Sequence, residues 1–184
     1  MSELKKRLYN NLGLTLIEIL AVIVILGIIS YIAVPAIGNI IENAKKDAHI
    51  ANAYQVISAV RNALHDDIIK DSQAFNVIPI GYLYENGYLE KGGNPDSGKD
   101  YIEKIDGKTD IKGFDTVDDL TVWWWGNRKK SSSYVVTAQS KVVYINLINE
   151  KRGVQTKAGF PKLLYDINTG ETYEITRDDI NNTP

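Results

Sequence analysis

Hydrophobic side chains are concentrated in one uninterrupted run near the N-terminus. No charged residue occurs between Ile19 and Ile37. A transmembrane α-helix needs roughly 20 consecutive, mainly apolar residues, and this run has about that length. The pattern therefore predicts a helix that can cross a membrane. We expect Gly27 to weaken this helix and Pro35 to produce a kink or a melted turn near its end.

The apolar spacing continues as a helical pattern beyond this run. Two apolar stripes recur every three or four residues with charged residues between them, which is typical of an amphipathic helix. The stripes are Ile37, Ile41, Ala44, Ala48 and Ala51, and then Ala53, Ile57, Val60, Leu64 and Ile68. We expect one long helix from Leu14 to about Ile69. Its apolar segment is 14–37, and its amphipathic segment, 38–72, packs on a folded domain.

Helical periodicity ends near Gln73, and residues 73–184 predict an outer domain. Segments rich in Val, Ile, Tyr, Trp and Thr are typical of β-strands. They are Leu120 to Trp125, Tyr134 to Gln139, Lys141 to Ile148, Leu163 to Ile167 and Thr172 to Thr176. A connection as short as Asn168 to Glu171 implies antiparallel neighbours. The predicted fold is α+β: a long helix on an antiparallel sheet of about four or five strands, with a short helix or turn near Tyr82 to Leu89 and a loop-rich region at 90–119.

Charge adds an orientation to this picture. The 184 residues carry a formal net charge of -2, so the chain has no general basic field that would favour nucleic acid. Lys5, Lys6 and Arg7 nevertheless precede the apolar run. Positive residues beside a membrane helix tend to stay in the cytoplasm, so the outer domain is expected outside the cell. The chain has no cysteine, which excludes disulfides, thiolate metal sites and a cysteine nucleophile.

Glu18 stands at the head of the apolar run and needs its own explanation. An ordinary secretory signal fits poorly, because its apolar region is usually about 7–15 residues long and Ala33 to Ala36 lack the usual cleavage pattern. A plain single-pass anchor accounts for the length and the basic flank but not for the carboxylate. Thr15 and Glu18 have the spacing of a capping box, in which both residues satisfy backbone N–H groups at a helix N-terminus.

A third interpretation accounts for the whole stretch from Gly13 to Pro35. Its sequence, Gly-Leu-Thr-Leu-Ile-Glu before an apolar run, closely resembles the N-terminal motif of type IV pilins and pseudopilins. The resemblance implies that prepilin peptidase cuts between Gly13 and Leu14, removes the leader 1–13 and methylates the new N-terminus. Glu18, Gly27 and Pro35 then lie where the family commonly carries glutamate, glycine and proline. Leu14 departs mildly from the Phe or Met that is more usual at the first mature position.

The resemblance also implies a role for Glu18 between subunits. The methylated amine of Leu14 in one copy would neutralise Glu18 in another while the helices bundle in a filament core. This agrees with the cost of an unpaired Asp or Lys at the centre of a membrane helix, about 2.5–3.5 kcal/mol. Capping by Thr15 and pairing with Leu14 are compatible, so both are expected. A helix loosened between Gly27 and Pro35 would be able to stretch during assembly.

Two patterns in the outer domain resemble ligand sites only in part. Residues Gly93 to Lys99 fit G-x-x-x-x-G-K, but Asp100 follows where a phosphate loop needs Ser or Thr, so we expect a turn-rich loop. The acidic residues from Asp96 to Asp119 lack the alternating spacing of a calcium loop, and a solvated surface is expected there.

The histidines offer no further chemistry. His49 and His65 lack a spacing that would make them joint metal ligands, and we expect both to be exposed polar residues. No nucleophile–base arrangement or metal cluster is recognisable in the sequence. Neither an enzymatic activity nor a cofactor is therefore predicted.

The run Trp123 to Trp125 followed by Arg128, Lys129 and Lys130 is the most unusual outer sequence. Aromatic and basic side chains together can hold single-stranded nucleic acid, and they can also contact a glycan or another cell surface. In a strand, Trp123 and Trp125 would share one face and Trp124 would take the other. We favour two core tryptophans with Trp124 in a subunit contact. Trp124 and the three basic residues are the candidate surface contacts.

The expected function is therefore that of a structural subunit of a type IV pilus or a similar surface filament. Expected partners are further copies of the chain, prepilin peptidase, the assembly platform and, before assembly, the cytoplasmic membrane. Gly27 with Pro35 favours a true pilin, and the lack of cysteine favours a Gram-positive or otherwise divergent type. Alternatives are a pseudopilin of a secretion or DNA-uptake machine, with DNA binding as a third variant, and a single-pass membrane protein whose outer domain binds a ligand.

Overall fold

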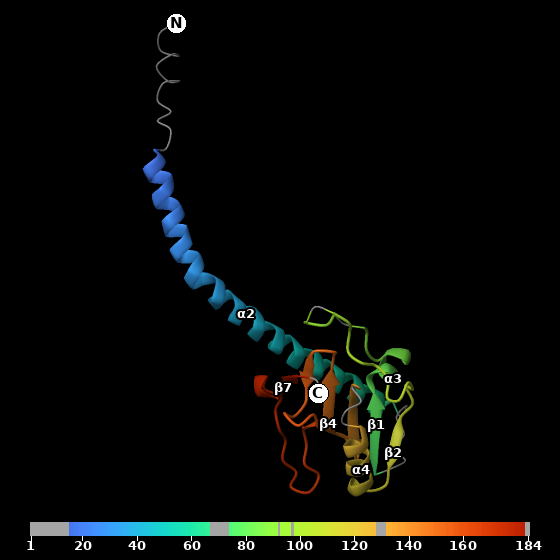
Figure 1. Ribbon diagram of the computed structural model, residues 1–184. Coiled ribbons are helices and arrows are strands. Elements are labelled where there is room, and N and C mark those ends of the chain that lie inside the picture. The colour runs from blue at the N-terminus through green and yellow to red at the C-terminus, as the bar shows by residue number, and fades with distance from the viewer. Residues whose placement is uncertain (1–14, 67–73, 92, 97, 128–131, 183–184) are drawn as a thin grey trace. The chain divides into compact units, whose positions relative to one another are not determined.

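The computed structural model describes residues 15–66, 74–91, 93–96, 98–127 and 132–182. The chain divides into two units, Met1–Glu42 and Asn43–Pro184, and each is described by itself. Helix α2 (Leu16–His65) contributes to both units (Figure 1).

The described part of the first unit is helix with no protein cover. Every large hydrophobic side chain from Leu16 to Ile41 is at least 44% exposed. The helix is long and apolar enough to cross a membrane, as the sequence predicted. The helix also continues without interruption through Gly27 and Pro35, so the expected melted turn is not present.

In the second unit, the C-terminal part of α2 provides one wall of the core. Its buried apolar residues are Ala53, Val56, Ile57, Ala59, Val60 and Ala63. They contain the predicted stripe that starts at Ala53, and Leu64 packs against the same cluster although it is only partly buried. Ile68 lies outside the described residues. The other predicted stripe is not part of this core, because Ile37 and Ile41 are 53% and 51% exposed.

An antiparallel sheet lies against this wall, which confirms the α+β class. Its strands are β1 (Phe75–Pro79), β2 (Lys112–Phe114), β3 (Tyr134–Ala138), β4 (Lys141–Ile148), β5 (Arg152–Val154), β6 (Lys162–Leu163) and β7 (Ile180–Asn182). The order is β2-β1-β3-β4-β5-β7, with β6 paired to β4. The sheet thus has seven strands, more than the sequence predicted. A short helix, α3 (Ile80–Glu85), occupies part of the segment where a short helix or turn was expected, and a 3-10 turn (Arg177–Asp179) precedes β7.

The longest pairing in the sheet is the β3–β4 hairpin. Residues from Val135 to Ala138 face residues from Lys141 to Ile145, and a bulge lies between Val136 and Thr137. The turn uses Gln139 and Ser140, whose φ angles are 52° and 58°. Two successive residues in the left-handed region suit the right-handed twist of a tight hairpin. The two strands predicted here are confirmed almost to their ends.

The second face of the sheet is covered by helix α4 (Val117–Asn127). The predicted strand Leu120 to Trp125 is therefore wrong. Thr116 caps the helix reciprocally with Asp119, because the Asp119 N–H donates to Thr116 Oγ1 at 3.1 Å and Thr116 Oγ1 donates to Asp119 Oδ2 at 2.6 Å. Leu120, Trp123 and Trp124 then follow at helical spacing and pack on the sheet. Capping and periodicity outweigh the strand propensity of the aromatic residues.

The last predicted hairpin is shorter than expected. Only Lys162–Leu163 forms a strand in its first arm, and a single bridge, Tyr165 to Thr172, joins the two arms. The turn itself is confirmed: the Gly170 N–H donates to the Asp166 carbonyl at 2.8 Å, and Gly170 has a φ of 77°. Only glycine adopts such an angle at little cost.

Gly153 of β5 gives a direct test of this packing. An added Cβ would fall on the Leu147 carbonyl oxygen and lie 2.5 Å from the Ile148 Cα, so Gly153→Ala must shift backbone. We expect it to lower the free energy of unfolding by about 1–3 kcal/mol, as overpacked sites do. Urea unfolding followed by circular dichroism measures this. The control is Gly93→Ala, where nothing lies within 4 Å of the added atom; equal stability of the two variants would contradict the register of β4 and β5.

Candidate functional site

The start of helix α2 contains the predicted capping box. The Glu18 Oε2 atom accepts hydrogen bonds from the Thr15 N–H at 2.7 Å and from Thr15 Oγ1 at 2.8 Å. The Glu18 N–H lies 3.4 Å from Thr15 Oγ1, to which it donates. This confirms the local role predicted for Glu18. Gly13 and Leu14, the residues of the predicted cleavage site, lie outside the described residues.

Gly27 and Pro35 lie further along the same exposed helix. A Cβ added at Gly27 would meet nothing within 4 Å, so no close approach inside this unit requires glycine there. Pro35 lies inside the helix and is not at either end. Within the described chain, neither residue is brought together with Glu18 by a folded site.

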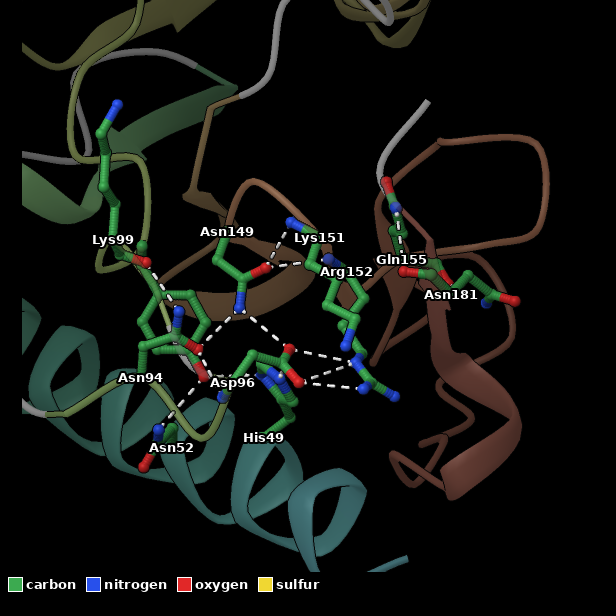
Figure 2. A network of polar contacts seen from close by, with 11 residues as sticks. His49, Asn52, Asn94, Asp96, Lys99, Asn149, Lys151, Arg152, Gln155 and Asn181 are labelled. Carbon is green, nitrogen blue, oxygen red and sulfur yellow. Dashed lines mark hydrogen bonds and ion pairs between the residues drawn. The ribbon is translucent and has the colours of Figure 1, made fainter. Parts of the chain in front are cut away.

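A buried polar network in the second unit is the site that sequence analysis missed (Figure 2). Asp96 is its centre and is 2% exposed. Asp96 Oδ1 accepts from Arg152 Nη2 at 2.9 Å and from Arg152 Nε at 3.1 Å. Asp96 Oδ2 accepts from His49 Nε2 at 3.0 Å, from Arg152 Nε at 3.0 Å and from Asn149 Nδ2 at 3.2 Å. One carboxylate therefore joins helix α2, the loop after α3 and the turn between β4 and β5.

Asparagine side chains shape the two loops that meet at Asp96. Asn149 Oδ1 accepts from the backbone N–H groups of Lys151 and Arg152, both at 2.8 Å, which folds the β4–β5 turn. Asn94 Oδ1 accepts from the Asp96 N–H at 2.9 Å and from Asn149 Nδ2 at 2.7 Å. Such side-chain to backbone bonds are the reason that asparagine favours turns. These bonds fix the loop that carries the Asp96 carboxylate and the turn that carries the Arg152 guanidinium.

His49 connects the carboxylate to Tyr101. Its Nδ1 lies 2.8 Å from the Tyr101 hydroxyl, which also accepts from Asn52 Nδ2 at 3.1 Å. Because Asp96 can only accept when ionised, we assign the imidazole proton to Nε2. Nδ1 then accepts from the Tyr101 O–H, so both ring nitrogens of His49 have a hydrogen-bond partner. Burial raises the pKa of Tyr101, which keeps this hydroxyl protonated.

The charge balance of the network follows from the same contacts. Burial by itself raises the pKa of Asp96, but the hydrogen bonds from His49, Arg152 and Asn149 outweigh it and lower this pKa from 3.8 to about 2. The ionised carboxylate thus faces the guanidinium of Arg152, and the Asn149 amide adds a donor without charge. A buried ion pair tolerates its loss of solvation only when its remaining hydrogen bonds are made, as they are here.

The network can hold the fold together, but it offers no open reaction centre. His49, Asp96 and Tyr101 are 0%, 2% and 4% exposed, so a substrate atom has no access to the imidazole in this conformation. Two sequence-based expectations are corrected here. His49 is not an exposed polar residue, and Asp96 does not belong to a solvated acidic surface. The reason is the same for both, since each is the buried partner of the other; His65, in contrast, is exposed as expected.

The tryptophans divide differently from the prediction because their segment is a helix. Trp124 is half-buried against Tyr144, with ring centroids 4.8 Å apart, and its role in a subunit contact stays a prediction. Trp123 packs edge-on against Tyr134 at 5.5 Å. Trp125 is the exposed member at 57% and lies 5.2 Å from Phe160. Arg128, Lys129 and Lys130 lie outside the described residues.

The second unit also contains an open groove, which we call the α2 groove. Its cavity volume is about 950 Å³, and its walls come from the C-terminal part of α2, the start of β4 and the segment around residues 164–174. Its lining includes Ile57, Arg61, Lys141, Val142, Leu164, Thr172 and Glu174. Among the residues that the structure describes, no group of His, Cys, Asp or Glu side chains is arranged to hold a metal ion.

The Asp96 network makes a specific stability prediction. Asp96→Asn keeps the shape of the side chain but removes the negative charge that faces the buried Arg152 guanidinium. We expect a loss of about 3–5 kcal/mol in the free energy of unfolding, measured by urea titration at neutral pH. Asp110→Asn, at an exposed position, is the matched control and should change stability by less than about 0.5 kcal/mol.

The pH dependence of the same pair identifies the cause. A folded pKa below the unfolded value means that the carboxylate of Asp96 stabilises the fold fully above about pH 4 and loses this effect as the pH falls toward 2. The stability difference between the wild-type chain and Asp96→Asn should therefore shrink over that range. A difference that stays constant down to pH 2 would show that the charge is not responsible.

Comparison with known proteins gives no relative from which a role could be transferred, since no family model, no curated protein and no solved structure matches this chain.

Proposed function

We propose that this chain is the structural subunit of a type IV pilus-like surface filament, made as a membrane prepilin and assembled through its N-terminal helix. The observation that carries the proposal is the contrast between the two parts of α2. From His49 onward the helix is built into a core, whereas from Leu16 to Ile41 every large apolar side chain is exposed. An apolar surface of this extent needs a membrane or other apolar helices around it. In a filament subunit, this apolar surface lies in the membrane before assembly and against the helices of other copies afterwards.

The geometry at Glu18 is compatible with a second partner. Both hydrogen bonds that its carboxylate accepts from Thr15 end on Oε2. A carboxylate has two oxygens and about four lone-pair sites. Among the described residues nothing donates to Oε1. This oxygen can accept a hydrogen bond from the methylated amine of Leu14 of another copy while the local cap stays intact. Glu18 would then cap its own helix and bind the N-terminus of the neighbouring copy.

The proposed sequence of events follows from these two features. Prepilin peptidase cuts after Gly13 on the cytoplasmic side and thereby creates the cation that Glu18 needs. The assembly platform then moves the helix from lipid into a bundle of equivalent helices, where Gly27 and Pro35 allow adjustment of its length. The sheet domain stays outside and forms the filament surface.

A single-pass membrane protein with a ligand-binding outer domain is the alternative that a structural observation favours. The α2 groove has a volume near the upper end of the 300–1,000 Å³ typical of small-molecule sites. That function needs no cleavage and no partner for Glu18. A pseudopilin of a secretion or DNA-uptake machine would share the cleavage but not the long surface filament.

Intact-mass analysis of the surface protein tests the proposal. We expect a mass that begins at Leu14 and carries one additional methyl group. Gly13→Leu should keep residues 1–13 and abolish filaments on the cell surface, with the protein still in the membrane. An unprocessed wild-type chain on the surface would refute the proposal and favour the single-pass alternative.

Two substitutions separate the cap from the pairing. Glu18→Gln keeps a residue that can complete a capping box but removes the charge. Thr15→Ala keeps the charge but removes the hydroxyl of the cap. If Glu18 pairs with the amine of another copy, Glu18→Gln should abolish filaments in electron micrographs while Thr15→Ala retains them. Membrane extracts blotted for the processed chain control for expression. Filaments of normal length with Glu18→Gln would leave Glu18 only its local role.

A further inference from the structure

Helix α4 leaves an apolar ridge exposed. Its inward face consists of Leu120, Trp123 and Trp124, which pack on the sheet. Val122 and Trp125, three residues apart on the helix, are 72% and 57% exposed. We call these two residues the α4 ridge. Neither residue belongs to the two buried core clusters, and the ring of Trp125 packs edge-on against Phe160.

The α2 groove has the complementary form. Ile57, Val142 and Leu164 make its floor and are buried, whereas Arg61 and Lys141 stand exposed at its rim. The exposed rim leaves the apolar floor accessible, so the groove can also take side chains that protrude from another folded surface.

The charged side chains around the α2 groove indicate which kind of surface it can bind. Arg61 makes no hydrogen bond or ion pair with a described residue, and the Lys141 ammonium group is hydrogen-bonded to the Tyr165 hydroxyl and lies over its ring without facing a described carboxylate. The two cations outnumber Glu174, the one carboxylate of the groove's described lining. On α4, Asp118 lies one turn before Val122 and is likewise exposed without a partner. The ridge therefore carries an unpaired negative charge, and the groove carries unpaired positive ones.

The two surfaces belong to opposite faces of the sheet. Ile57 and Leu164 are part of the core cluster beneath α2, whereas Leu120 and Trp124 are part of the cluster beneath α4. One copy therefore cannot place its own ridge in its own groove. A contact between two different surfaces of identical chains leaves one of each free, so it can repeat without closing into a pair.

We propose that the outer domains of successive copies bind head to tail, with the α4 ridge of one copy seated in the α2 groove of the next and Asp118 facing Arg61 and Lys141. This contact rests on the proposed function, because it names the outer-domain interface between copies of the filament subunit. Apolar packing between the N-terminal helices holds the copies together, but it is non-directional and does not fix how their outer domains align. The ridge and groove add register, because opposite charges oppose each other in only one arrangement.

Cysteine cross-linking of the full-length chain on cells tests the contact, and the natural chain has no cysteine to interfere. Val122→Cys places a thiol on the ridge, and Thr172→Cys places one at the exposed wall of the groove. With a short bismaleimide reagent, the chain carrying both substitutions should form a ladder of dimers, trimers and longer products. Each single substitution should give no cross-link, and cells that produce both single variants should give dimers only. Dimers from Val122→Cys alone would overturn the proposal, because they would mean that α4 pairs with α4.

Charge reversal tests the pairing in the same two-cysteine chain. Arg61→Glu and Asp118→Lys should each reduce the ladder at least about tenfold, which corresponds to about 1.4 kcal/mol of contact energy. The chain with both reversals should recover it, because the opposite charges again face each other. Lys104→Glu, an exposed residue outside both surfaces, is the control and should have no effect. A ladder that is insensitive to Arg61→Glu and Asp118→Lys would overturn the proposed register.

The filament itself separates a failure of this contact from a failure of the proposed function. Processed chains and visible filaments without a ladder would overturn only the ridge-and-groove contact. Unprocessed chains without filaments would refute the function, and the contact would fall with it.

Discussion

Helix α2 must satisfy two environments along one continuous backbone, and this constraint organises the rest of the chain. Its first part carries large aliphatic residues on all sides, so no direction around the helix is polar enough to face water. Its second part buries a narrow stripe in which Ala53, Ala59 and Ala63 alternate with larger residues. Small residues let a sheet approach the helix closely, and the polar remainder of the helix surface stays solvated. The change from one pattern to the other determines where the folded domain can begin.

Attachment of the sheet to α2 depends on more than apolar packing. The chain between α3 and β2 contains little regular structure, and ordering it costs conformational entropy. Asp96 offsets part of this cost by joining that loop to His49 and Arg152, which come from two other elements. Buried ion pairs contribute little net stability compared with apolar packing, but they penalise every arrangement in which one partner is missing. In this protein such a penalty specifies where an otherwise irregular loop lies.

The parts of the structure that the sequence predicted are those encoded by neighbouring residues. The exposed apolar helix, the Thr15–Glu18 cap and the β3–β4 hairpin all arise from patterns within a few residues. Helix α4 was assigned to the wrong class because three tryptophans favour strand, although the Thr116–Asp119 spacing already indicated a helix start. A capping-box search through the outer domain would have found it.

The buried network was not predictable in the same way. Asp96 lies 47 residues from His49 and 56 from Arg152 in sequence, and no local pattern records a pairing over that distance. Only the asparagines at 94 and 149 gave a local signal, and that signal indicated turns. The strands β1, β2, β5 and β7 were missed for a related reason. β1 and β5 are buried throughout, so neither shows the alternation by which a half-buried strand is recognised, and β2, β5 and β7 have only three residues each.

The tryptophan run has a consequence for how this protein can be observed. All three tryptophans of the chain are in α4, and two of them bury an indole N–H that has no acceptor among the described residues. The tryptophan fluorescence of the chain therefore originates in one helix on one face of the sheet. Its intensity and wavelength report whether α4 is docked, because undocking would expose the indoles of Trp123 and Trp124 to water. A spectroscopist could thus follow the outer domain of the purified chain without attaching a dye.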